Sequence, residues 1–315
     1  MADKYIFVND PQEKTPIYEM SKEEFQKIEP ANAKVFEVFH IEELFAMLVD
    51  NLYAFNNVIF TYADKARLKS VFSDNYFQKR LDVNRTALNF FAGLSLYQDF
   101  VRERIKAPEI ADSLLQNREI QRCIAMRNYI QHVESFPVIS CTSFSWCDLN
   151  VELSSVRFRV STKDLKVDKL RKGTKKAFDK FFEEDEQIDL YEILNQGMGE
   201  VQLIQSQIRK LPLYEEYSQS KAFLLDIEKK ITRRGISSIS PCYYYESDDE
   251  QNWKTCFVAM DTIKFIDENI SHYPCLSSSA DKFITTAPTD FVDKCRRSFS
   301  PATRAATVKQ IQKKK

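Results

Sequence analysis

The stretch FHIEELFAMLVDNLYAFNNVIFTYA, residues 39–63, decides the fold class, because its apolar residues repeat with the period of an α-helix. The repeating positions are Ile41, Leu44, Phe45, Leu48, Leu52, Phe55 and Ile59. The stretch therefore predicts a long amphipathic helix.

Two further helical patterns follow in the chain. Asn84 can cap a second helix, and Pro108 interrupts the pattern after it. A third helix is expected over residues 109–132. It should end before Pro137, because the residue before a proline disfavours the helical conformation. Three helices of this length predict an α-helical bundle.

The pattern then changes to β-branched and aromatic residues. Residues 138–144 and 151–160 predict a β-hairpin, and residues 243–246 and 253–260 predict a second one. Helical patterns return over residues 189–208, 214–234 and 261–270. The expected fold class is mainly α (α+β), a helical bundle with two inserted or appended β-hairpins.

These changes of pattern suggest four parts. They are an N-terminal covering segment (1–35), the helical bundle (36–137), a part with a hairpin, long helices and the second hairpin (138–270), and a C-terminal segment with a basic tail (271–315). In the first part, Ser21 and Glu24 form the pattern of a helix capping box.

Composition excludes several classes of protein. A chain of 315 residues with 43% hydrophobic and 29% charged residues and a net charge of −1 is globular and neither disordered nor fibrous. Its five glycines form no phosphate-binding loop, so dinucleotide and P-loop folds are not expected. Its seven cysteines are scattered without metal-ligand spacing, so we expect reduced thiols, no bound metal and no cofactor.

The chain also lacks the patterns of export and membrane insertion. It begins Met-Ala-Asp-Lys, with no apolar signal segment after it. The longest charge-free runs, residues 51–63 and 86–98, are shorter than the roughly 20 apolar residues that a membrane span needs. We expect a cytoplasmic protein without a membrane partner.

One cluster of polar residues lies within the expected third helix, in the segment Arg127-Asn-Tyr-Ile-Gln-His132. Asn128 and His132 are four residues apart and share a helix face, as do Arg127 and Gln131. Arg127 and His132 are five apart, which separates them by about 140° on a regular helix. They can meet on one phosphate only if the helix end unwinds or a second chain contributes.

This segment resembles the R-x4-6-H signature of the HEPN superfamily, helical-bundle proteins that are often ribonucleases of prokaryotic toxin–antitoxin and phage-defence systems. The resemblance includes the polar Asn128 after the arginine and covers about 100 residues up to Pro137. It implies a HEPN-like bundle, RNA as the partner, and a homodimer in which two motifs meet. Glu134 stands where one toxin subgroup has a tyrosine, so a partner that modifies this tyrosine is not implied.

RNA cleavage without a metal needs a base, an acid and fixed positive charge at the phosphate. Arg127 suits the charge, because guanidinium binds phosphate through two parallel hydrogen bonds. His132 suits proton transfer near neutral pH. Asn128 could orient the phosphate or the imidazole, and Gln131 shares the Arg127 face. Either Asp99 or Glu103 could orient Arg127.

Other interpretations remain open at this point. Arg127 could form a structural ion pair while His132 caps the helix C-terminus. The chain would then be a non-catalytic RNA-binding or protein-interaction subunit of a larger complex, and a regulatory protein partner fits either function. From Lys294 onward no acidic residue balances the basic ones. This tail is either a passive terminus or an arm that attracts phosphate.

Overall fold

The computed structural model describes residues 4–8, 16–67, 76–133, 138–146, 152–183, 186–232, 242–246, 254–256 and 258–273. The basic tail lies outside them. Its α-helices are α1 (Lys22–Arg67), α2 (Tyr76–Arg104), α3 (Pro108–Gln116), α4 (Arg118–Val133), α5 (Lys172–Phe181), α6 (Leu190–Ile208), α7 (Pro212–Thr232) and α8 (Met260–His272). Its strands are β1 (Lys4–Val8), β2 (Pro16–Ser21), β3 (Val138–Trp146), β4 (Glu152–Ser161), β5 (Gln187–Asp189), β6 (Cys242–Glu246) and β7 (Lys254–Cys256). The fold is mainly helical with antiparallel sheets, which confirms the expected class.

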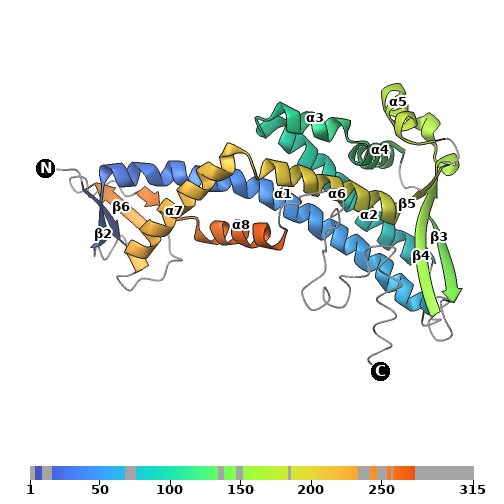
Figure 1. Ribbon diagram of the computed structural model, residues 1–315, viewed down its shortest axis with the longest axis horizontal. Helices are drawn as coiled ribbons and strands as arrows, with labels where there is room; N and C mark the ends of the chain where they lie inside the picture. Colours follow the sequence, from blue (N-terminus) through green and yellow to red (C-terminus); the bar gives the residue numbers. More distant parts are fainter. Residues whose placement is uncertain are drawn as a thin grey trace. The chain divides into compact units, whose positions relative to one another are not determined.

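The described residues form two compact units (Figure 1). Unit 1 contains those up to Glu43 and those from Arg209 onward, and unit 2 contains those from Leu44 to Ile208. This division differs from the four parts expected from the sequence. The difference arises because α1 runs without a break through residue 35, and because the first hairpin belongs to the same unit as α2 to α4.

Helix α1 begins where the capping box predicts. The Ser21 backbone N–H donates to Glu24 Oε2, and the Glu24 N–H donates to Ser21 Oγ, both at 3.2 Å. The helix then continues through Pro30 and joins the pattern of residues 39–63. The described part of residues 1–35 therefore belongs to β1, β2 and α1 and does not form a separate covering segment.

By length and composition alone, α1 could also cross a membrane. The core helix of a soluble protein passes the same test. In unit 1 the side chains of Val35 and Val38 are 0% exposed, and in unit 2 those of Phe45 and Leu48 are 0% exposed. These apolar side chains are buried within the protein itself, which favours the role of a core helix.

Unit 1 contains a sheet of strand order β2-β1-β6-β7, and all neighbours are antiparallel. The β6–β7 hairpin was expected from the sequence, and its register places Cys242 opposite Cys256. Strand β1 pairs with the other edge of β6, with Tyr5 opposite Glu246. That pairing joins two segments that lie far apart in the chain, which local sequence patterns do not reveal.

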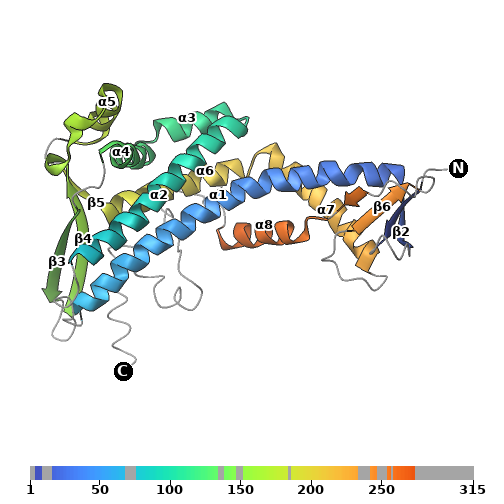
Figure 2. The ribbon, with the colours of Figure 1, turned by 180° about the vertical axis from the view of Figure 1, so that it is seen from behind.

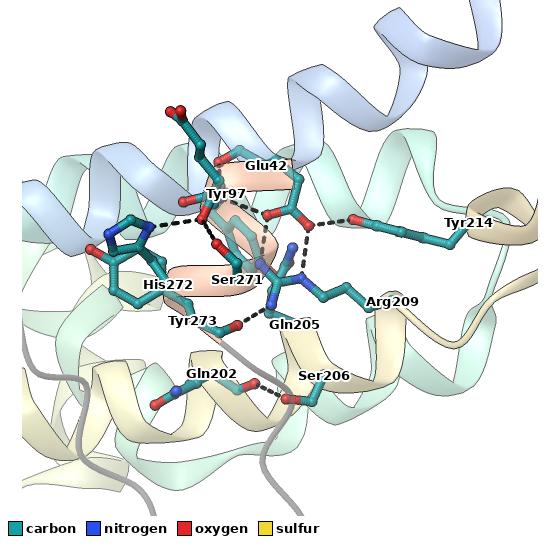
Figure 3. A network of polar contacts seen from close by, with 12 residues as sticks. Glu42, Tyr97, Gln202, Gln205, Ser206, Arg209, Tyr214, Ser271, His272 and Tyr273 are labelled. Atoms are coloured by element: carbon teal, nitrogen blue, oxygen red, sulfur yellow. Dashed lines mark hydrogen bonds and ion pairs between the residues drawn. The ribbon is translucent and has the colours of Figure 1, made fainter. Parts of the chain in front are cut away.

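A buried ion pair between Glu42 and Arg209 links several segments of unit 1 (Figure 3). Arg209 donates from Nε to Glu42 Oε1 at 2.8 Å and from an Nη atom to Oε2 at 2.7 Å, and the Glu42 side chain is 0% exposed. Tyr214 Oη donates to Oε1 at 2.8 Å, and Asn269 Nδ2 donates to Oε2 at 2.6 Å. Arg209 also donates to the Tyr273 carbonyl. The carboxylate therefore connects α1 to the segment before α7, to α7 and to α8.

Unit 2 contains the predicted bundle and the first hairpin. Strands β3 and β4 pair from Val138 opposite Val160 to Trp146 opposite Glu152, which confirms the hairpin. Strand β5 adds a third strand against β4. The described residues also include α5 and two 3₁₀ turns before it, η2 (Thr162–Asp164) and η3 (Val167–Lys169), which the sequence patterns did not predict.

Two helix boundaries in unit 2 differ from the expected ones. Helix α2 begins at Tyr76, so Asn84 lies inside the helix and does not cap it. The expected third helix is divided into α3 and α4 at Asn117. The Asn117 Oδ1 atom accepts hydrogen bonds from the N–H groups of Glu119 at 3.0 Å and Ile120 at 3.1 Å. This side-chain cap lets the chain leave one helix and start the next.

Helices α4 and α6 approach closely at Gly197. A Cβ atom at this position would lie 2.7 Å from Cys123 Sγ, closer than real contacts allow. The Cys123 thiol is buried and donates to the Ile193 carbonyl at 3.4 Å. Glycine at 197 therefore sets the distance between the two helices, and so the position of α4.

Replacing Gly197 by alanine should destabilise the protein. Overpacking against Cys123 costs about 1–3 kcal/mol, and the gain in helix propensity from Gly to Ala is about 1 kcal/mol. We expect a net loss of up to about 2 kcal/mol in the free energy of unfolding by urea. Gly173→Ala is the control, because no atom lies within 4 Å of its added Cβ. Cys123→Ala should restore most of the stability of G197A, and an unchanged midpoint for G197A would contradict the packing argument.

Replacing Glu42 by glutamine should destabilise unit 1 strongly. The change leaves the Arg209 guanidinium buried without its carboxylate, which costs about 3–5 kcal/mol. Glu268→Gln is the matched control, because its carboxylate lies on the surface 4.0 Å from Lys264. An exposed pair of this kind contributes at most about 1 kcal/mol. Thermal unfolding of both variants measures the difference, and equal melting temperatures would show that the buried pair is dispensable.

Candidate functional site

The four polar residues of the expected site lie on α4, which is one unbroken helix from Arg118 to Val133. With 100° per residue and Arg127 as the origin, Gln131 lies at about 40°, Asn128 at about 100° and His132 at about 140°. Arg127 and Asn128 are half-buried, and Gln131 and His132 are exposed. The four side chains form one continuous polar strip along the last turns of α4.

The opposite side of α4 is packed into unit 2. Ala125, Met126 and Tyr129 are 5%, 0% and 1% exposed. They lie at about 160°, 260° and 200° on the same angular scale, outside the arc of the polar residues. Burial of this apolar side therefore turns the polar strip away from the core.

The structure pairs Arg127 with its neighbour in the sequence. Arg127 donates from an Nη atom to Asn128 Oδ1 at 3.0 Å. The amide oxygen thereby restricts the position of the guanidinium group. Asn128 thus orients Arg127, a partner that the sequence did not indicate for it.

The carboxylates proposed to orient Arg127 bind a different arginine. Asp99 lies 3.0 Å and Glu103 lies 3.3 Å from Arg102, and all three belong to α2. These pairs join residues three apart and next to each other in the sequence, so they form within the helix itself. The expectation that Asp99 or Glu103 orients Arg127 therefore has no support among the described contacts.

The regular course of α4 excludes one of the two ways in which Arg127 and His132 could meet on one phosphate, an unwound helix end. The helix does not unwind between them, so they remain about 140° apart around its axis and about 7.5 Å apart along it. One chain alone does not bring both groups to the same side of a phosphate. Of the two alternatives, a contribution from a second chain remains.

Tyr129 is a structural residue within the motif, and the sequence alone assigned no role to it. Its Oη accepts a hydrogen bond from the Lys166 backbone N–H at 3.1 Å. Its ring lies 6.0 Å from the Phe178 ring of α5. Burial raises the pKa of the Tyr129 hydroxyl, and the hydrogen bond from Lys166 opposes this change. Tyr129 therefore attaches the η2–η3–α5 segment to the side of α4 next to His132.

A second contact joins α4 to the end of α5. Arg122 forms ion pairs with Glu186 and, at 3.7 Å, with Glu119. Its guanidinium carbon lies 5.0 Å from the centre of the Phe182 ring. Together with Tyr129, this cluster holds α5 against α4 at two points.

Other chemistry can be assessed for the described residues. Among them, no three His, Cys, Asp or Glu side chains come together as metal ligands. Cys123 is fully buried, and burial raises the pKa of its thiol, which is unfavourable for a nucleophile. In the part of the chain that the structure describes, Arg127, Asn128 and His132 are therefore the residues that we assign to the candidate site.

Comparisons of this chain with models of protein families, with curated proteins and with solved structures found no match.

The structure predicts effects of different size on stability for Tyr129 and His132, two residues of the motif. His132→Ala removes an exposed side chain and should change the free energy of unfolding by less than about 0.5 kcal/mol. Tyr129→Phe removes the acceptor of the Lys166 N–H and should cost about 1–2 kcal/mol. Urea unfolding of both variants tests this order. A larger loss for H132A than for Y129F would favour the interpretation of His132 as a structural helix cap.

Proposed function

We propose that this protein is a metal-independent endoribonuclease that acts as a homodimer. The observation that carries the proposal is the exposed strip at the end of α4, where Asn128 holds the Arg127 guanidinium and His132 follows one turn later. A fixed positive charge and a nearby proton carrier are what phosphodiester cleavage without a metal requires. His132 is exposed and Arg127 is half-buried, so neither group is enclosed in the core of unit 2.

The chemistry assigns one role to each residue. His132 removes the proton from a ribose 2′-hydroxyl, and the 2′-oxygen forms a bond to the adjacent phosphorus. Arg127 stabilises the additional negative charge of the phosphorane-like transition state through bidentate hydrogen bonds. The bond to the 5′-oxygen then breaks, and this oxygen takes a proton from a histidinium. The products are a 2′,3′-cyclic phosphate and a 5′-hydroxyl.

A dimer supplies what one copy lacks. On one helix, Arg127 and His132 are about 140° apart. A second copy can place its His132 beside the first copy's Arg127, so that two histidines flank one phosphate as base and acid. The resemblance of this motif to the HEPN superfamily supports the same arrangement. It also supports a role in prokaryotic phage defence or a toxin–antitoxin pair, with regulation by a partner protein.

A second candidate function is a non-catalytic protein-interaction subunit. One surface of α2 favours it, because four large apolar side chains are exposed there. Phe77, Leu81, Leu88 and Leu96 are 72%, 59%, 39% and 51% exposed. They fall within an arc of about 100° on the helix. Such a surface is typical of sites that bind another protein.

Cleavage of RNA by the purified chain tests the proposed function. In excess chelator, the protein should cleave a labelled RNA of mixed sequence and leave 2′,3′-cyclic phosphate ends. Arg127→Ala and His132→Ala should each lower the rate by about 10²-fold or more, because they remove the charge and the proton carrier.

The controls for this assay replace residues of the same type outside the polar strip. Arg118→Ala changes another arginine of α4, and His40→Ala changes an exposed histidine of α1. Both variants should cleave at the wild-type rate. Wild-type cleavage by H132A, or cleavage only when Mg²⁺ is added, would reject the mechanism. Absence of cleavage with retained binding to a protein partner would favour the interaction subunit.

A further inference from the structure

The net charge of the chain is close to zero, but one segment of it is strongly basic. Residues 163–180, which form η2, η3 and α5, contain eight lysines and arginines and three acidic residues. The whole chain has a net charge of −1, so the remainder is net negative. Most of these basic side chains are exposed. Positive charge is therefore concentrated on one short surface segment of unit 2.

Helix α5 arranges part of this charge in a line. Lys172, Lys176 and Lys180 follow one another at intervals of four residues, so they lie within an arc of about 80° and about 6 Å apart along the axis. All three are exposed. Lys175 lies on another side of the helix and pairs with Asp168 at 2.6 Å. The row of three lysines presents evenly spaced positive charge to the solvent.

The apolar side of α5 is already occupied. Phe178 and Phe182 are 3% and 6% exposed, and their rings contact Tyr129 and Arg122 of α4. An amphipathic helix that binds a membrane inserts its apolar side into the lipid. Since α5 uses that side to pack on α4, its outer surface offers charge without an apolar anchor.

The same contacts place the basic segment beside the polar strip of α4. Tyr129, which receives the Lys166 N–H and contacts Phe178, lies about 60° from His132 around α4. In Figure 1 and in the view from behind in Figure 2, α5 lies next to α4 within unit 2. The segment that carries the basic surface therefore packs on α4 beside the His132 edge of the strip.

We propose that the η2–η3–α5 segment is a binding surface for the phosphate backbone of RNA, which leads the strand to the Arg127–His132 strip. The proposal rests on the proposed function for the identity of the nucleic acid. Repeated lysines match a repeating phosphate charge, and contacts of this kind bind without reading the base sequence. The surface thus gives affinity, and the strip carries out the reaction.

Binding of a short, labelled single-stranded RNA of mixed sequence tests the surface independently of cleavage. The measurement uses the full chain with His132→Ala, so that the RNA stays intact. Adding Lys172→Gln, Lys176→Gln and Lys180→Gln should weaken binding at low salt by about tenfold or more, and should reduce the slope of log K against log salt by about 2. The control adds Lys27→Gln, Lys106→Gln and Lys210→Gln, which change three other exposed lysines by the same charge. This control should bind like H132A alone.

A second measurement needs no substitution of the α5 lysines. Chemical acetylation of lysines in the H132A protein, read by mass spectrometry, should show protection of Lys172, Lys176 and Lys180 by the RNA. Lys27 and Lys210 should react equally with and without RNA.

A conservative variant completes the binding measurement. Replacing Lys172, Lys176 and Lys180 by arginine keeps the charge and should preserve RNA binding.

The outcomes separate this surface from the proposed function. Weaker RNA binding by the α5 glutamine variant supports the surface even if His132→Ala leaves cleavage intact, a result that would reject the nuclease mechanism alone. Unchanged RNA affinity and no protection in α5 would overturn the surface, even if H132A abolishes cleavage. Binding to vesicles of phosphatidylserine and phosphatidylcholine that depends on the three lysines, with RNA affinity unaffected by them, would also overturn it.

Discussion

The close contact between Gly197 of α6 and Cys123 of α4 is the constraint on which the candidate site depends. A side chain larger than hydrogen at 197 would meet the thiol, so this contact sets how near α4 lies to α6. With its apolar side fixed there, α4 exposes His132, leaves Arg127 and Asn128 half-buried, and buries Tyr129. Tyr129 in turn receives the Lys166 N–H and positions the basic segment. The steric limit at Gly197 thus fixes the side of α4 that carries Arg127 and His132, and with it the position of the basic segment.

Local periodicity was sufficient to predict most of the helices and both hairpins. The stripe from Ile41 to Ile59 lies in α1, and the capping box of Ser21 and Glu24 forms as expected. Boundaries were less predictable, because they depend on competing local effects. Pro30 is tolerated within α1, Asn84 lies inside α2, and Asn117 caps α4 at a position where the hydrophobic pattern continues. The pairing of β1 with β6 is non-local and leaves no periodic signal.

The sequence proposed the members of the candidate site, and the structure shows partners that the sequence did not indicate. The predicted helical separation between Arg127 and His132 is present, because α4 is a regular helix. The partner of Arg127 could not be chosen from the sequence. Asp99 and Glu103 can pair with Arg102 on their own helix as easily as with an arginine of another helix. Tyr129 was overlooked for a related reason, since its role depends on a backbone N–H 37 residues away. The motif identifies the candidate groups, and the contacts within the fold determine how those groups are held.

The division of the chain has a consequence for how the protein is made. The described residues of unit 2 form one continuous segment from Leu44 to Ile208, whereas those of unit 1 come from both sides of it. During synthesis the carboxylate of Glu42 emerges long before Arg209, Tyr214 and Asn269, which neutralise it or donate hydrogen bonds to it. Unit 2 can therefore fold on the ribosome while unit 1 waits for its second half, since domains generally fold as units during synthesis. Until then strand β1 lacks its neighbour β6, and its unpaired edge is open to incorrect strand pairing.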